Sequence, residues 1–233
     1  MSLRDPLRSP DAQRRAAACA QAASDPSAVV WVDALADALA DDVRSVRDAA
    51  STALAVIGRD HDVTAALKRT LHGNDARGRW AAAWTLARLA PPEPALIPAA
   101  VEALDADEGS VRWRAARLLV ELGRLHAEVP PLLCGLARQG ASPGVKRMAL
   151  FCLRDLAPGE RHTWEVLLEA THEPDPVLRR AAFTALAGML DPPPATLARL
   201  ARAADDERDP VCRALASRAL GALTHQVTPA SPA

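Results

Sequence analysis

Tryptophan and arginine recur at one-turn spacing in the middle of the chain, and these residue types can bind flat or acidic groups. Trp80 and Trp84 are four residues apart, as are Trp113 and Arg117. Four residues span about one helical turn, so each pair should lie on one side of a helix. Indole and guanidinium groups are enriched at binding hot spots and also stack on flat partners. The pattern therefore raises the hypothesis of a binding surface.

A repeat of 32 to 34 residues places these pairs on helices. Its position zero falls at Gln13, Val46, Gly78, Val111, Val145, Leu178 and Cys212. The next position always holds Arg or Lys, and the fourth always holds Ala. In units two to seven the eighth position is Leu and the eleventh is a large aliphatic residue. The spacing 0, 4, 8 and 11 marks one stripe of a helix, so an amphipathic helix should start near each anchor.

A second helical pattern precedes most of these helices, as in "VTAALKRTL" and "WEVLLEA", and prolines interrupt the chain between units. Each unit is therefore predicted to be a helical hairpin. One hairpin cannot bury its apolar stripe alone, so neighbouring hairpins must stack. We expect an all-α fold, a right-handed α-solenoid of about seven hairpins over residues 1–224, with a disordered tail at 225–233.

The segments "DPVLRRAAFTALAGML" and "DEGSVRWRAARLLVELG" resemble bacterial HEAT-like repeats of the short PBS-lyase type, whose pattern is D-x-x-V-R-x-x-A-x-x-x-L. The resemblance covers nearly the whole chain. Tetratricopeptide and ankyrin repeats have a similar length, but the chain has no Tyr and no T-P-L-H sequence. The resemblance implies an α-solenoid that serves as a binding scaffold.

The repeated acids and bases are interpreted as structural. Carboxylates three residues before an anchor can cap a helix start, and these are Asp75, Glu108, Asp175 and Asp209. In the family that the chain resembles, the repeated Arg belongs to an Asp–Arg ladder between adjacent repeats. Unit five departs from the pattern with Ser142, Pro143 and Lys146, so an interrupted ladder is expected there.

The ends of the array differ from its middle. In unit one, Gln21 and Ser24 occupy the eighth and eleventh positions, where other units carry apolar residues. Polar residues at these places are typical of a solvent-facing capping repeat. Only ten residues precede the anchor helix of this unit, so its first helix should be truncated or absent.

On each second helix, positions 2, 6, 9 and 10 lie opposite the buried stripe, and in HEAT-like solenoids this side lines the concave groove. The bases at these positions are Arg15, Arg88, Arg117, Arg147, Arg154, Arg180 and Arg218. The acids are Asp48, Glu121 and Asp155. Seven bases minus three acids leave about +4 on this face, while the whole chain carries −1. The groove is therefore predicted to be basic.

The same face carries four of the seven aromatic residues, and the predicted contact set is Trp80, Trp84, Trp113, Arg117, Arg147, Phe151 and Arg154. Trp80 and Trp113 occupy equivalent positions in neighbouring repeats and should lie side by side. The alternative is that these tryptophans pack over small alanines of the adjacent repeat. Trp31 and Trp164 lie on first helices and are interpreted as packing residues.

Composition indicates the cellular location of the protein and whether it holds a cofactor or a metal. No apolar run is long enough to span a membrane, and no signal peptide precedes the array. The four cysteines are scattered without a CxxC pair, which favours free thiols, a reducing compartment and a cytoplasmic location. We expect no cofactor and no metal.

HEAT-like architecture also occurs in three types of enzyme. Di-iron hydroxylases need several His-Glu pairs, and only His172–Glu173 is present. An alkylpurine DNA glycosylase would use the tryptophans as an aromatic cleft, with Asp155 or Glu121 as the carboxylate. Nothing specific supports a bilin lyase subunit. We expect a non-catalytic scaffold or adaptor for an acidic, or acidic and apolar, protein segment, with nucleic-acid binding or a glycosylase-like enzyme as the alternative.

Overall fold

The computed structural model describes residues 4–25, 27–58, 61–193 and 195–227, and all regular elements in this part are helices. In chain order they form seven pairs of a shorter first helix and a second helix. The chain divides into two compact units, Met1–Ala103 and Leu104–Ala233. The predicted all-α solenoid class is therefore confirmed.

The unit Met1–Ala103 contains the first three pairs and the first helix of the fourth. Its elements are α1 (Arg4–Leu7), α2 (Ala12–Ala23), η1 (Ala28–Trp31), α3 (Val32–Ala38), α4 (Arg44–Ile57), α5 (His61–Leu71), α6 (Ala76–Leu89), η2 (Pro94–Leu96) and α7 (Ile97–Ala103). The second helices α2, α4 and α6 pack on one another in sequence, and α3 packs on α5. Each hairpin therefore buries its stripe against the next one.

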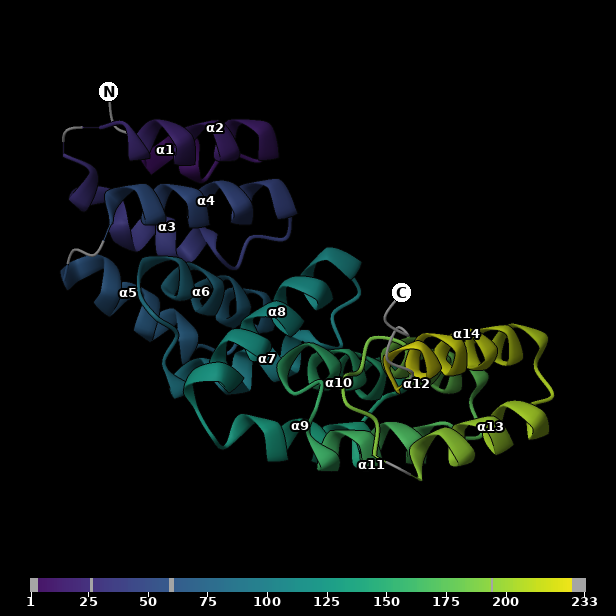
Figure 1. The fold of residues 1–233 in the computed structure, drawn as a ribbon. Coiled ribbons are helices and arrows are strands. Elements are labelled where there is room, and N and C mark those ends of the chain that lie inside the picture. Colours follow the sequence, from purple (N-terminus) through teal and green to yellow (C-terminus); the bar gives the residue numbers. More distant parts are fainter. Residues whose placement is uncertain (1–3, 26, 59–60, 194, 228–233) are drawn as a thin grey trace, which may run out of the picture. The chain divides into compact units, whose positions relative to one another are not determined.

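The unit Leu104–Ala233 repeats this two-layer arrangement. Its helices are α8 (Gly109–Leu125), α9 (Val129–Gln139), α10 (Pro143–Leu156), α11 (Arg161–Ala170), α12 (Pro176–Leu186), α13 (Thr196–Asp206) and α14 (Pro210–Val227). The helices α8, α10, α12 and α14 pack in one row, and α9, α11 and α13 form the other row (Figure 1). Side chains on neighbouring second helices are consequently brought next to one another.

Alanine at the centre of each second helix lets neighbouring helices approach closely. The six alanines at the fourth position of units two to seven are fully buried; they are Ala50, Ala82, Ala115, Ala149, Ala182 and Ala216. Alanine also favours the helix itself, because it loses no side-chain entropy on folding. The predicted stripe is therefore the contact line between repeats in these units.

The repeated arginine fastens each hairpin turn to its own second helix. In six units its guanidinium donates to the carbonyl six residues earlier; the pairs are Arg15–Ser9, Arg47–Asp41, Arg79–Gly73, Arg112–Ala106, Arg179–Glu173 and Arg213–Glu207. The planar fork of donors suits this role, because one guanidinium can bind two groups at fixed angles. The arginine therefore closes the turn that precedes its helix.

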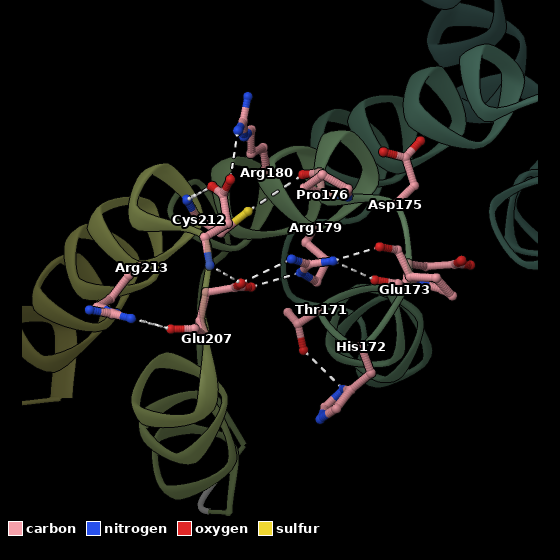
Figure 2. A network of polar contacts seen from close by, with 12 residues as sticks. Thr171, His172, Glu173, Asp175, Pro176, Arg179, Arg180, Glu207, Cys212 and Arg213 are labelled. Carbon is pink, nitrogen blue, oxygen red and sulfur yellow. Dashed lines mark hydrogen bonds and ion pairs between the residues drawn. The ribbon is translucent and has the colours of Figure 1, made fainter.

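The same basic residue also links adjacent repeats. Arg179 donates to both oxygens of Glu207, at 2.7 and 3.0 Å, while it holds the carbonyl of Glu173 (Figure 2). Arg15–Asp41, Arg79–Glu102 and Lys146–Glu173 are equivalent ion pairs. The ladder implied by the family resemblance is present, but its acids come from the next hairpin. The expected interruption at unit five is wrong, since Lys146 reaches Glu173 at 3.1 Å.

Carboxylates cap several helix starts. Asp75, Asp175 and Asp209 accept hydrogen bonds from backbone N–H groups in the first turns of α6, α12 and α14. The predicted cap at Glu108 is wrong, because its side chain makes no capping hydrogen bond at the start of α8. Its carboxylate stands one methylene further from the backbone than that of aspartate, which suits the capping position less well.

The register predicted for unit one is shifted by one residue. Gln13 and Ala17 were expected on the buried stripe, but both are exposed, and Ala18, Cys19 and Ala22 are buried instead. Arg15, not Arg14, makes the turn-closing hydrogen bond. Gln21 and Ser24 are exposed, as expected for a solvent-facing capping repeat, and the truncated first helix is confirmed by the four-residue α1.

The predicted boundary at residue 224 also needs correction. Helix α14 continues through Val227, and the Gln226 side chain donates to the carbonyl of Met189 at 3.1 Å. This hydrogen bond ties the end of α14 to the preceding repeat. The remainder of the predicted tail, 228–233, lies outside the described residues. Within the described part, no helix combines the length and apolar character needed to cross a membrane.

Candidate functional site

The two tryptophans of α6 stack on each other. Their ring centroids are 5.9 Å apart with an interplanar angle of 30°. Trp80 is buried, with only 9% of its surface exposed, whereas Trp84 is half-buried. Trp80 therefore offers a partner little area, and its position agrees with the packing alternative. The prediction that Trp80 and Trp113 lie side by side concerns residues of two different compact units, and it stays a prediction.

The aromatic residues of α8 and α10 meet across neighbouring repeats. Trp113 and Phe151 stack with centroids 5.5 Å apart and an interplanar angle of 22°. Trp113 remains 50% exposed, and Phe151 is half-buried. Stacked rings of this kind are stabilised beyond the area they bury. The outer part of the Trp113 indole is thus held in place and still open to solvent.

Arginines border this aromatic pair on both helices. The Arg154 guanidinium lies 5.4 Å from the centroid of the Phe151 ring and pairs with Asp155 at 2.6 Å. Arg117 follows Trp113 by one turn, and Arg147 precedes Phe151 by one turn. We call Trp113, Arg117, Arg147, Phe151 and Arg154 the aromatic–arginine surface. Five of the seven predicted contact residues are therefore brought together.

The surface contains a hollow of about 410 Å³ between α8 and α10. Trp113, Arg117 and Phe151 line it, together with Glu121 and Asp155. Within the described residues, Arg117 and Arg147 have no hydrogen-bond or ion-pair partner. Their charges are available without breaking an existing contact, which distinguishes them from the arginines of the ladder.

Two other arginines of the predicted groove are already occupied. Arg15 pairs with Asp41 at 2.7 Å, and Arg180 pairs with Asp209 at 2.9 Å. The hydrogen bond from Arg15 lowers the pKa of Asp41, and the hydrogen bond from Arg180 lowers the pKa of Asp209. The predicted charge of about +4 on the groove therefore includes two arginines that already have an acidic partner. Sequence reasoning counted their charges but could not see their partners.

Sequence reasoning missed Arg124 and the second hollow that it lines. Arg124 lines the hollow at Trp113 and also a second hollow of about 930 Å³ beside α9 and α11. It lies outside the four positions assigned to the groove, so the repeat pattern gave no reason to include it. The second hollow could have been suspected from Gly135, because neighbouring units carry larger side chains at the equivalent position.

The predicted packing role of Trp164 is confirmed. Only 1% of its surface is exposed, and its indole N–H donates to the carbonyl of Leu190 at 3.2 Å. Trp31 is half-buried in η1, and its indole N–H donates to Asp25 at 3.1 Å. These two tryptophans stabilise first helices and offer no stacked, exposed face comparable to Trp113.

The reactive side chains of the described part occupy structural places. The four cysteines are buried free thiols, and burial raises the pKa of Cys19 to about 11 and that of Cys152 to about 12. Within the described residues, no group of three or more His, Cys, Asp or Glu side chains is arranged to hold a metal ion. Hydrogen-bond donors lower the pKa of Glu169 and Glu207, and neither carboxylate lines the aromatic hollow.

The helical rows and their repeated ladder define the class of α-solenoid repeat proteins. A sequence profile of HEAT repeats matches residues 70–154 and 129–221, which together cover more than half of the chain. The chain belongs to the HEAT repeat family. Comparison with curated protein sequences gives no match.

Solved structures with a similar fold include an engineered protein, which is 19% identical with a TM-score of 0.46 and 96% of each chain covered. Human deoxyhypusine hydroxylase in complex with glycerol is 23% identical, with a TM-score of 0.42, over 94% of this chain and 82% of that one. The complex of CpcE and CpcF of phycocyanin lyase from Nostoc sp. is 23% identical, with a TM-score of 0.40, over 97% and 87%. These likenesses concern the fold alone.

Proposed function

We propose that this HEAT repeat protein is a non-catalytic scaffold whose aromatic–arginine surface binds a protein segment with acidic and apolar side chains. The observation that carries the proposal is the unpartnered guanidinium of Arg117 in the hollow that the half-exposed Trp113 and Phe151 also line, with unpartnered Arg147 one turn before Phe151. Such a surface offers an apolar anchor and two cations, of which Arg117 lines the hollow and Arg147 lies one helical turn before Phe151. Trp and Arg are the residue types that contribute most at protein interfaces.

Charge complementarity explains why the segment should be acidic. A carboxylate can pair with Arg117 or Arg147 without displacing an internal partner, so the guanidinium gives up only water. Arg154 is different, because it pairs with Asp155 and lies over the Phe151 ring. We assign Arg154 the role of holding Phe151 in its stacked position. The free cations set the preference, and the aromatic stack supplies the apolar contact.

The α6 tryptophans receive separate roles in the proposal. Trp84 is half-buried and can contribute a second contact region in the unit Met1–Ala103. Trp80 is buried and exposes too little surface for direct contact with a partner. Because it stacks on Trp84, we assign it the role of supporting that residue. The proposed direct contacts are therefore made by the aromatic–arginine surface in the unit Leu104–Ala233, and Trp84 is a separate candidate within the unit Met1–Ala103.

Binding to a panel of short synthetic peptides tests the proposal. Peptides that combine Asp or Glu with Phe or Leu should bind the wild type, and peptides with Lys in place of the acids should not. The Arg117→Glu/Arg147→Glu variant should bind the acidic peptides at least about tenfold more weakly, because attraction becomes repulsion at two sites. Fluorescence anisotropy of labelled peptides measures both comparisons.

A matched control separates this surface from general charge effects. Arg202 and Arg208 are exposed and, like Arg117 and Arg147, without a partner in the described part; they lie on and after α13. The Arg202→Glu/Arg208→Glu variant changes the net charge equally and should keep wild-type affinity. Equal affinity of all three proteins for the acidic peptides would refute the proposed surface. Salt-dependent binding of single-stranded or duplex DNA in place of the peptides would favour the nucleic-acid alternative.

A further inference from the structure

The second hollow, of about 930 Å³, lies in the unit Leu104–Ala233 where the ends of α8 and α10 meet α9 and α11. Pro130, Pro131 and Pro158 form part of its wall, and proline has no backbone N–H to donate. Cys134 and Leu156 add further apolar surface. The lining therefore suits an apolar group better than a polar one.

Gly135 lines the hollow at a place where other first helices carry a side chain. Ten residues before the anchor, neighbouring units carry Val101, Leu168 and Arg202, whereas unit five carries Gly135. In the next repeat, the equivalent residue is Leu168 of α11, and its side chain is buried. A Cβ atom added at Gly135 would meet no atom within 4 Å. Gly135 itself is exposed, so this position of α9 faces the open side of the hollow and carries no side chain.

The charges around the hollow differ in availability. Arg138 is held by Glu169, with distances of 2.7 and 3.2 Å to its two carboxylate oxygens. Arg124 has no partner in the described part, and it lines this hollow as well as the one at Trp113. A carboxylate paired with Arg124 would consequently lie between the two hollows. One extended segment can occupy both places if an acidic residue separates its two apolar contacts.

We infer that the hollow at Gly135 binds a leucine-sized apolar side chain of the same partner segment that contacts the aromatic–arginine surface. This inference rests on the proposed function and refines it to a motif of three parts. An apolar or aromatic residue contacts Trp113, an acidic residue pairs with Arg124, and a second apolar residue enters the hollow at Gly135. The glycine is therefore a specificity-determining position.

Filling the hollow tests the inference, with the tightest acidic peptide of the panel as the probe. The Gly135→Leu variant should lower its affinity at least about tenfold, because the new side chain occupies the site of the second apolar residue. Gly221→Leu is the matched control, since Gly221 of α14 also has no atom within 4 Å of an added Cβ. Gly135→Ala should retain binding, and circular dichroism should confirm equal helix content in all variants.

A second peptide makes the test specific. When the apolar residue assigned to the hollow is replaced by alanine, wild type and Gly135→Leu should bind the peptide equally. Unchanged affinity of Gly135→Leu for the original peptide would overturn the inference while leaving the proposed function intact, provided that Arg117→Glu/Arg147→Glu still loses binding. If no acidic peptide binds the wild type, both are overturned. If wild type binds decanoate and only Gly135→Leu abolishes that binding, the hollow is a lipid site and the inference is overturned. If wild type self-associates and only Gly135→Leu abolishes this, the hollow binds a second copy of the chain and the inference is likewise overturned.

Discussion

Trp164→Ala is expected to lower the free energy of unfolding by about 3–5 kcal/mol, the range for replacing a buried aromatic residue by alanine. The side chain lies on α11 with 1% of its surface exposed, and its indole N–H donates to the carbonyl of Leu190. The substitution removes this hydrogen bond and leaves a cavity between repeats that the helices can only partly close. Urea denaturation followed by circular dichroism measures the loss.

Trp113→Ala is the matched comparison. Half of this side chain is exposed, so its removal costs mainly the stacking on Phe151, about 0.5–1.5 kcal/mol. We therefore expect Trp164 to contribute to stability and Trp113 to be available for binding. A larger loss for Trp113→Ala than for Trp164→Ala would contradict this division.

Removing the buried carboxylate of the ladder should have the second largest effect. The Glu207 side chain is 4% exposed and accepts two hydrogen bonds from Arg179 and one from the backbone N–H of Asp209. Glu207→Ala should destabilise the protein by about 3 kcal/mol, the lower end of the range for breaking a buried ion pair, because Arg179 keeps some access to water. Glu169→Ala, at the more exposed pair with Arg138, should cost at most about 1 kcal/mol.

The effect of Glu207 should depend on pH with a defined sign. The hydrogen bonds from Arg179, followed by the backbone N–H of Asp209, lower its pKa in the folded protein. A carboxyl group with a lowered pKa stabilises the fold above its unfolded pKa of about 4.3 and loses this contribution as the pH falls through its folded pKa. Wild type and Glu207→Ala should therefore differ fully at pH 7 and converge below about pH 4. A difference that grows on acidification would contradict the assignment.

The repeat made the fold predictable from the sequence, because one stripe recurs in every unit from two to seven. Unit one was misaligned because "AQRRAAACAQAA" offers two adjacent arginines and many alanines, so two registers fit almost equally well. The burial of Ala18, Cys19 and Ala22 and the hydrogen bond from Arg15 to the carbonyl of Ser9 distinguish them. A run of small, chemically similar residues predicts a helix well, but it does not show which face of that helix is buried.

The candidate site was predictable in composition and only partly in geometry. The helical spacing placed Trp113 and Phe151 on one face, and the stacking of their rings agrees with that. The same reasoning could not separate Trp80, which is buried, from Trp113, which is exposed. It also could not identify which arginines were paired, since Arg180 finds its partner Asp209 in the next hairpin. Burial and pairing depend on neighbouring repeats, and the position within one repeat does not encode them.

Fluorine NMR of protein labelled with 5-fluorotryptophan tests the central claim most directly. The Trp113 resonance is assigned from its loss in Trp113→Phe, and the acidic peptide that binds best is then added. We predict that the Trp113 resonance shifts on binding, whereas that of buried Trp164 does not. In Arg117→Glu/Arg147→Glu the Trp113 resonance should stay in place at the same peptide concentration. A peptide that binds while the Trp113 resonance remains unchanged would contradict the account.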